Sequence, residues 1–406
     1  MRRLIALVIL HAGALPAQQL ADRVASVQSG DATFSYAARP DVCGDGHVLL
    51  LRSLDPGSQM VVFSSGRGWG IATGSVDMGR QRCTRGPVRV QLSVRDRRIQ
   101  ELQPSVGKTG PGRGRDLGTL GTRGAVDFLL DLATRASKDV SSGALLAAAL
   151  ADSVTISPRL VTLADDRRLP AVNRVAALQW LGWTAAREDN RAADAHIRAI
   201  AADETDDPEV RERAIGVVAL PAGERFLEDL YPRLTLRDLK ARVIQALGER
   251  PSASSVDWIE RLARDRREPL ELRERAIRVL GEDLHEIRRL RSLYADVRDP
   301  ELKDLVMRVA GETGDADAIA WLKTVAVDRA QPVEARDRAL RALDEAGAPS
   351  AYFVSLYDTI GDSDLKLRLI KLLGERDDRA ARAKLADIVR HDTNPVLRRQ
   401  AQRARQ

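Results

Sequence analysis

Two patterns of apolar and polar residues divide the chain. Between about residues 32 and 103, short apolar runs alternate with glycine-rich turns, and in 88–94 apolar side chains take every second position. This period of two is typical of a strand with one buried face, so we expect strands here, including a hairpin that turns at 95–98. Beyond residue 121, apolar residues recur every three or four positions, which predicts helices.

Repeated blocks of sequence indicate how the helices are organised. Residues 238–250 return at 364–376 with nine of thirteen positions identical, and 211–215 returns unchanged at 273–277. Prolines lie at the start of the copies. The residues that end successive copies, the closing positions, are separated by six steps that average 32 residues. The closing positions are Gly182, Ala219, Gly248, Gly281, Gly311, Asp344 and Gly374. Proline suits a helix start and glycine the left-handed residue after its end, so each copy carries its own start and stop.

A second helix fits between successive copies. Val256, Ile259 and Ala263 form one apolar stripe, and equivalent stripes follow near residues 322 and 385. One pair of helices cannot bury such a stripe, whereas stacked pairs can. The period therefore predicts an α-solenoid, an elongated α-α superhelix of about eight pairs in which each repeat mainly contacts the next.

The start of one repeat resembles a known family. Residues 208–215 read Pro-Glu-Val-Arg-x-x-Ala-Ile, and another copy closes in Leu247-Gly248. This pattern resembles the short HEAT-like repeats first described in phycobilisome bilin lyases. The resemblance covers about residues 126–405 and implies a HEAT-like fold there. The resemblance does not imply one function, because the family includes lyases, scaffolds and adaptors.

The N-terminus has the plan of a secretory signal. Arg2 and Arg3 precede an apolar run at 4–10 and then small residues, with cleavage expected after Ala14 or Ala17. No later stretch is long and apolar enough to span a membrane. We therefore expect a periplasmic or secreted protein with four parts: a signal peptide at 1–17, a small all-β module at 18–104, a linker at 105–121 and the solenoid at 122–406. The linker assignment rests on six glycines and two prolines within 104–121.

Cys43 and Cys83 are the two cysteines of the chain. In an exported protein we expect them to form one disulfide in the β module. Closing a loop of about 40 residues stabilises a fold by roughly 3–4 kcal/mol in the chain-entropy model. A metal site is the alternative, but His47 is the one histidine nearby, which leaves that site a ligand short.

Motifs for catalysis or cofactor binding are incomplete. Gly107-Lys108-Thr109 is similar to the end of a phosphate-binding loop, but Leu102 occupies the position of the required earlier glycine. His285-Glu286 begins like a zinc-protease helix, but Arg289 stands where the second histidine would be. Paired acidic residues lie beside predicted turns, where they cap helices. We therefore predict no catalytic, metal or cofactor residues, and a protein that is not an enzyme.

Arginines that recur inside the repeats are the candidate binding residues. They are Arg174, Arg211, Arg273, Arg336 and Arg368. On a solenoid they could form a ladder along one face, either as a basic groove for an acidic partner or as structural residues that bond a neighbouring repeat. The formal charge of +6 falls to about +4 without Arg2 and Arg3, which is a mixed surface that does not favour nucleic acid.

These observations together predict a non-catalytic scaffold or adaptor that binds a protein or peptide partner on the repeats. Two alternatives stay open. The resemblance implies a bilin-lyase type of enzyme, but such lyases act in the cytoplasm, against the predicted signal. Nucleic-acid binding, as in HEAT-like DNA glycosylases, requires a basic groove, against the balanced charge.

Overall fold

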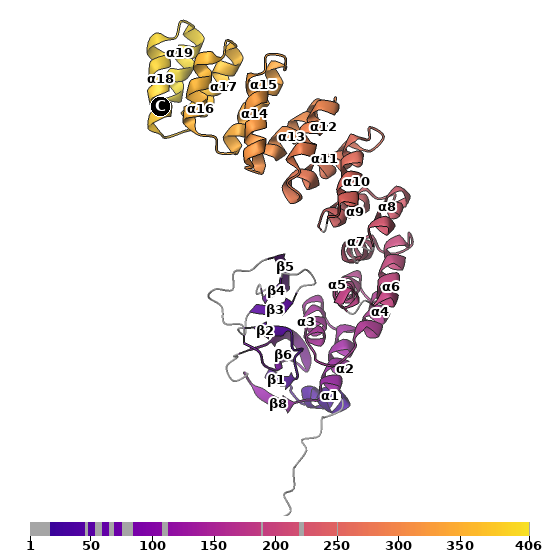
Figure 1. The fold of residues 1–406 in the computed structure, drawn as a ribbon. Coiled ribbons are helices and arrows are strands. Elements are labelled where there is room, and N and C mark those ends of the chain that lie inside the picture. Colours follow the sequence, from indigo (N-terminus) through magenta and orange to yellow (C-terminus); the bar gives the residue numbers. More distant parts are fainter. Residues whose placement is uncertain are drawn as a thin grey trace, which may run out of the picture. The chain divides into compact units, whose positions relative to one another are not determined.

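A computed structural model describes residues 17–44, 48–52, 59–64, 69–74, 84–107, 113–187, 190–218, 223–249 and 251–405 (Figure 1). The chain divides into two compact units, Met1–Ala219 and Leu220–Gln406. Most of the predicted signal peptide lies outside the described residues. Cys83, His47 and Lys108 lie outside them too.

A four-stranded sheet begins the first unit. Its strand order is β7 (Arg98–Ser105), β6 (Val88–Arg95), β1 (Gly30–Tyr36) and β8 (Arg115–Thr119). β1 pairs antiparallel with β6 and parallel with β8. In β6, buried positions alternate with half-buried ones, which confirms the predicted period of two. The predicted hairpin is present and turns at Asp96 and Arg97, both with positive φ.

A second sheet has the order β2 (Val42–Gly44), β3 (Val48–Arg52), β4 (Gln59–Ser64) and β5 (Trp69–Gly74), with antiparallel pairing throughout. Next to Cys43, Gly44 exchanges two backbone hydrogen bonds with Thr84, at 3.1 and 2.9 Å. The residues that follow the two cysteines are therefore neighbours. The disulfide itself stays a prediction, because Cys83 is outside the described part of the chain.

The N-terminal region differs from the predicted all-β module and linker in two ways. A helix, α1 (Ala17–Ala25), precedes the first strand and packs on α2. Residues 115–119 of the predicted linker form the edge strand β8, in which Leu117 is buried. Gly114 has a φ of +80° and an added Cβ would lie 1.8 Å from the Asp31 carbonyl oxygen. This glycine therefore serves close packing against β1, and the linker prediction is wrong here.

The remaining helices of the first unit form pairs. They are α2 (Thr122–Ala133) with α3 (Lys138–Ala149), α4 (Ser157–Asp165) with α5 (Ala171–Arg187), and α6 (Arg191–Ala202) with α7 (Pro208–Val217). α5 packs between α3 and α7, and α4 packs on α6. Each pair therefore contacts the next, as the repeat pattern predicts.

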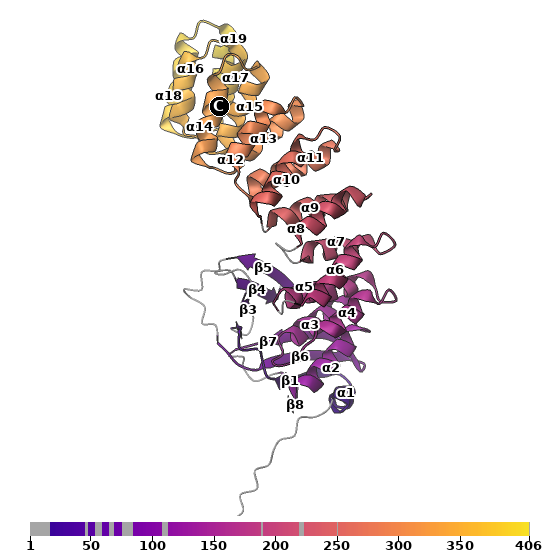
Figure 2. The same ribbon diagram turned by 45° about the vertical axis from the view of Figure 1, so that its right-hand side comes forward.

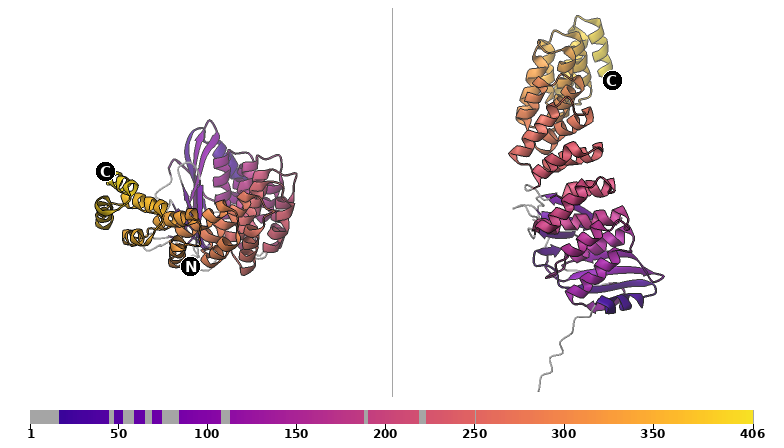
Figure 3. Two further views of the ribbon diagram at one scale, coloured as in Figure 1. Left: turned by 90° about the horizontal axis from the view of Figure 1, so that it is seen from above. Right: turned by 90° about the vertical axis from the view of Figure 1, so that its right-hand side faces the viewer.

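The first sheet covers the exposed side of the first helix pair. α3 packs on β7, and the sheet lies against the helices in the right-hand panel of Figure 3. The Tyr36 hydroxyl of β1 donates to the Ala147 carbonyl oxygen of α3 at 2.6 Å, and burial raises the pKa of Tyr36. Gly143 lets α3 approach Leu102 of β7 closely. The β region and the first helices thus share one core, and no boundary between compact units falls at residue 121.

The second unit consists of helix pairs in two layers (Figure 2). The even-helix layer contains α8 (Glu224–Leu230), α10 (Ala253–Arg264), α12 (Ile287–Asp296), α14 (Ala316–Val327), α16 (Ser350–Thr359) and α18 (Arg379–His391). The odd-helix layer contains α9 (Arg237–Glu249), α11 (Leu270–Arg278), α13 (Pro300–Glu312), α15 (Val333–Glu345), α17 (Ser363–Gly374) and α19 (Pro395–Ala404). Within the odd-helix layer, every helix contacts the next one. This is the architecture of an α-solenoid.

The closing glycines do not end helices in the predicted left-handed conformation. Gly248, Gly281, Gly311 and Gly374 have no positive φ, and instead lie where one odd helix, or the π-helical turn Val279–Asp283 that follows α11, touches the next. An added Cβ on Gly311 would lie 2.6 Å from the Ala342 carbonyl oxygen, and the other three would meet side chains at 2.1–2.7 Å. The prediction that these glycines adopt a left-handed conformation is wrong. Glycine is required both for such a turn and for close helix packing, and here it serves the packing.

We expect Gly311→Ala to destabilise the second unit. Alanine gains about 1 kcal/mol of helix propensity over glycine, but a backbone carbonyl cannot move aside easily, and overpacking costs about 1–3 kcal/mol. The free energy of unfolding, measured by urea denaturation with circular dichroism, should therefore fall. Gly361→Ala is the control, because nothing lies within 4 Å of its added Cβ. Equal stability of the two variants would contradict this packing role.

Candidate functional site

Four of the five candidate arginines are buried inside the helix pairs. Arg174, Arg211, Arg273 and Arg336 are 4–7% exposed, and each is the fourth residue of its odd-numbered helix. Each Nε–H donates to the carbonyl oxygen of an alanine ten residues earlier, at 2.6, 3.3, 3.2 and 3.1 Å. That alanine is the penultimate residue of the preceding helix, where carbonyls lack a helical partner. These arginines therefore join the two helices of a pair, and we call them the buried arginine row.

Arg174 has a second role. Its guanidinium donates two hydrogen bonds of 2.6 Å to the Asp206 carboxylate, and both side chains are 4% exposed. These hydrogen bonds hold the pKa of Asp206 below its usual value. Asp206 precedes α7, so the ion pair connects one helix pair to the next.

Arg368 belongs to a different row. It is the sixth residue of α17, and it donates to Asp337 of α15 at 2.5 and 3.1 Å. Arg213, Arg275 and Arg338 are the sixth residues of their helices, and each also bonds a polar residue of the preceding odd-numbered helix. The predicted ladder was therefore wrong in grouping Arg368 with the other four. The error was one of register, since the fourth residue of α17 is Lys366.

Lysines, which the predicted ladder did not include, occupy the fourth position in α9, α13 and α17. Lys240, Lys303 and Lys366 place their ammonium groups 4.7–4.9 Å from the ring centroids of Tyr231, Tyr294 and Tyr357, respectively. Each tyrosine hydroxyl donates to a polar side chain near the start of the next repeat, at 2.7–3.1 Å. Successive lysines of this set are 63 residues apart, and so are successive tyrosines. This spacing is visible in the sequence. Buried arginine and lysine–tyrosine junctions therefore alternate, and the true period of the second unit is two helix pairs.

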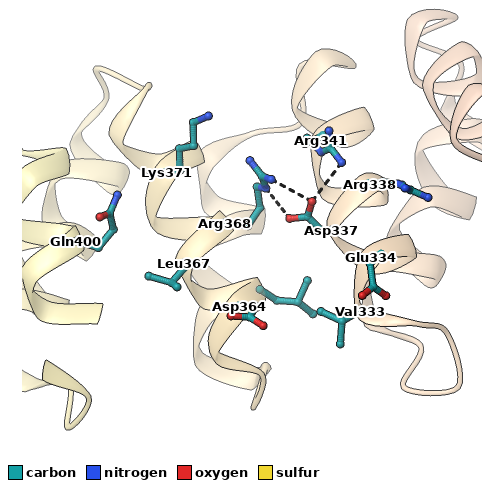
Figure 4. Close-up of a pocket in the computed structure, with 11 residues that line it drawn as sticks. Val333, Glu334, Asp337, Arg338, Arg341, Asp364, Leu367, Arg368, Lys371 and Gln400 are labelled. Atoms are coloured by element: carbon teal, nitrogen blue, oxygen red, sulfur yellow. Dashed lines mark hydrogen bonds and ion pairs between the residues drawn. The ribbon is translucent and has the colours of Figure 1, made fainter. Parts of the chain in front are cut away.

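The odd-helix layer of the second unit carries charged residues that pair with one another. Arg338 on α15 reaches Asp304 on α13 at 2.5 Å, and Arg341 lies 3.3 Å from Asp337 on the same helix. Asp337 also accepts the two bonds from Arg368 (Figure 4). The described guanidinium groups in this part of the layer are therefore engaged by carboxylates of the chain itself, which does not favour a groove for an acidic ligand.

The described histidines do not combine into a metal centre. His391 lies 2.7 Å from Asp387 and His196 lies 3.4 Å from Asp165, and all four side chains are at least 44% exposed. Within the described residues, no group of three or more His, Cys, Asp or Glu side chains is placed to hold a metal ion. Also within them, no helix has the length and apolar character needed to cross a membrane.

Comparisons with known proteins give structural neighbours alone. No family model and no curated protein matches the sequence. Lipovitellin aligns at 9% identity with a TM-score of 0.47, covering 92% of this chain and 44% of that one. Human deoxyhypusine hydroxylase aligns at 15% identity and a TM-score of 0.27, covering 70% and 95% of the two chains. Importin beta aligns at 13% identity with a TM-score of 0.33, and the alignment covers 70% of this chain and 49% of that one. The chain thus spans less than half of two of these neighbours, and at such TM-scores none informs its function.

We expect Arg174→Met to lower the free energy of unfolding by about 3–5 kcal/mol, because it leaves the buried Asp206 carboxylate without its cation. The double variant Arg174→Met/Asp206→Asn should recover part of this loss, since no uncompensated charge remains. Chemical denaturation followed by circular dichroism measures both.

Arg368→Met is the matched control. The Arg368 and Asp337 side chains are 24% and 21% exposed, and the loss of such a partly solvated pair costs about 1 kcal/mol or less. If Arg174→Met lowered the free energy of unfolding no more than Arg368→Met does, the buried ion pair would not stabilise the fold more than the partly solvated one.

Proposed function

We propose that the chain is a non-catalytic scaffold or adaptor that binds a protein or peptide partner on the odd-helix layer of its second unit. The supporting observation is that six helices lie side by side in this layer and are connected by ion pairs such as Arg338 with Asp304 and Arg368 with Asp337. A surface ordered before binding loses less conformational entropy when a partner docks. Stacked repeats characteristically use such extended surfaces for binding.

The pairing of charges supports a protein partner over a nucleic acid. Binding to a phosphate backbone depends on cations that can exchange bound counterions. Among the described residues of this layer, Arg242, Arg278 and Arg308 pair with Glu249, Glu282 and Glu312, in addition to the pairs between helices. A phosphate would have to compete with these carboxylates. The resemblance of residues 208–215 to HEAT-like repeats of the bilin-lyase type is, on this proposal, a resemblance of fold.

Photo-crosslinking tests the binding face. A photoreactive amino acid at Arg341 or Lys371, both exposed on the odd-helix layer, should form adducts with a protein in an extract of the cell envelope. The same amino acid at Arg288, which is exposed on α12 of the even-helix layer, should not. Equal adducts at all three positions, or none at Arg341 and Lys371, would count against the proposal.

We further propose that the protein is exported and that Cys43 and Cys83 form a disulfide. The N-terminal sequence from Arg2 to the small residues after position 10 supports export, and the backbone bridge between Gly44 and Thr84 brings the neighbours of the two cysteines together. An oxidising compartment would allow the bond to form.

Intact-mass measurement of the protein from a periplasmic fraction tests this second proposal. The expected mass corresponds to a chain that begins after Ala14 or Ala17 and gains two hydrogens on reduction. A Cys43→Ser variant provides the control, because its mass should not change on reduction. A full-length mass in the cytoplasmic fraction alone, or free thiols in the periplasmic protein, would refute export or the disulfide, respectively.

A further inference from the structure

A pocket of about 580 Å³ opens on the odd-helix layer between α15, α17 and α19 (Figure 4). This volume lies in the range of small-ligand pockets and suffices for one long side chain. Its apolar lining comprises Leu365, which is fully buried, and Val333 and Leu367, which are half-buried. The pocket therefore offers an apolar surface to a side chain that enters from outside.

Every cation of the pocket lining already has a carboxylate partner. Arg341 and Arg368 share Asp337, and Arg338 pairs with Asp304. The Lys371 ammonium lies 3.9 Å from Glu375. An acidic ligand would have to displace one of these internal partners.

Two carboxylates of the lining remain without a cation. Glu334 and Asp364 are exposed, and neither forms an ion pair with any described residue. Figure 4 shows both on one side of the ion pair between Arg368 and Asp337, and Lys371 on the other side. Because two arginines share Asp337, one positive charge is left over beside them, but the two unpaired carboxylates still make the remaining charge of the pocket negative, next to the apolar residues.

We propose that this pocket binds a lysine or arginine side chain of the partner protein. The aliphatic stem lies on Val333 and Leu367, and the cationic end lies between Glu334 and Asp364. Long basic side chains combine an apolar stem with a charged end in this way, and complementary charge determines which partner is accepted. The inference rests on the proposed scaffold function and specifies the chemistry of its partner.

The location of Glu334 and Asp364 near the starts of their helices explains in part why carboxylates occur there. Glu334 and Asp364 are the second residues of α15 and α17, where the positive end of the helix dipole favours a carboxylate. Glu301 is the second residue of α13 and is also exposed, but it does not line the pocket. A purely structural role would make all three residues equivalent, whereas the proposal separates Glu301 from the other two.

Calorimetric titration of the full chain with short peptides tests the proposal. The probe is the acetylated and amidated pentapeptide Ala-Leu-Arg-Leu-Ala, compared with the same peptide carrying citrulline, which keeps the shape of arginine without its charge. At low salt we expect the arginine peptide to bind about fivefold tighter or more, since each exposed ion pair contributes up to about 1 kcal/mol. Added salt should reduce this difference.

Variants locate the effect. Glu334→Gln/Asp364→Asn should weaken binding of the arginine peptide about five- to tenfold and leave the citrulline peptide unchanged, again from two exposed ion pairs. Glu301→Gln should bind both peptides like the original protein. Thermal unfolding of each variant confirms that it is folded.

Four results would overturn the inference. They are equal binding of the arginine and citrulline peptides, no binding of either, an equal loss of affinity in Glu301→Gln, and tighter binding of Ala-Leu-Glu-Leu-Ala, which would assign the pocket to an acidic side chain. If crosslinking at Arg341 and Lys371 still produced a partner, the scaffold function would stand without this specificity. If crosslinking also failed, both proposals would fall.

Discussion

In four helix pairs, a hydrogen bond from an arginine near the start of one helix to an alanine carbonyl at the end of the preceding helix joins the two helices. It occurs at Arg174, Arg211, Arg273 and Arg336, with the same separation of ten residues. A carbonyl in the last turn of a helix has no helical partner, and leaving it buried without a donor costs about 1–3 kcal/mol. These four guanidinium groups are consumed inside the fold and are therefore not available to a ligand.

The alternation of arginine and lysine at the same helix position follows from the chemistry of the two groups. A guanidinium has five N–H donors in a plane and tolerates burial against a carbonyl, whereas an ammonium is strongly hydrated and loses more when it is buried. Lys240, Lys303 and Lys366 are accordingly half-buried and lie over tyrosine rings, which attract a cation without removing all of its water. In the second unit, two consecutive helix pairs therefore have different junctions, and the 63-residue spacing of these lysines reflects that difference.

The sequence predicted those features that depend on neighbours along the chain. The alternation in 88–94 identified β6, and the repeated blocks identified the paired helices. It failed where one residue type serves two purposes: Gly311 permits close packing and Gly114 lies against a strand, yet both were interpreted as marks of turns or linkers. It also could not show that Glu334 and Asp364 lack partners, because whether a carboxylate is paired depends on residues about 30 positions away in the next helix pair.

The same reasoning explains why the net charge of a repeat surface does not reveal what it binds. The lining of the pocket between α15 and α17 contains more basic than acidic side chains. Asp337 nevertheless engages two of the arginines, and Asp304 and Glu375, which lie outside the lining, engage two further cations. An incoming group interacts with the charge that remains after this internal pairing, because displacing a partner returns an unpaired charge to a partly desolvated site. In this pocket the remaining charge is negative, although its composition is basic, and that difference separates an acceptor of basic side chains from the acidic-ligand groove suggested by the arginines alone.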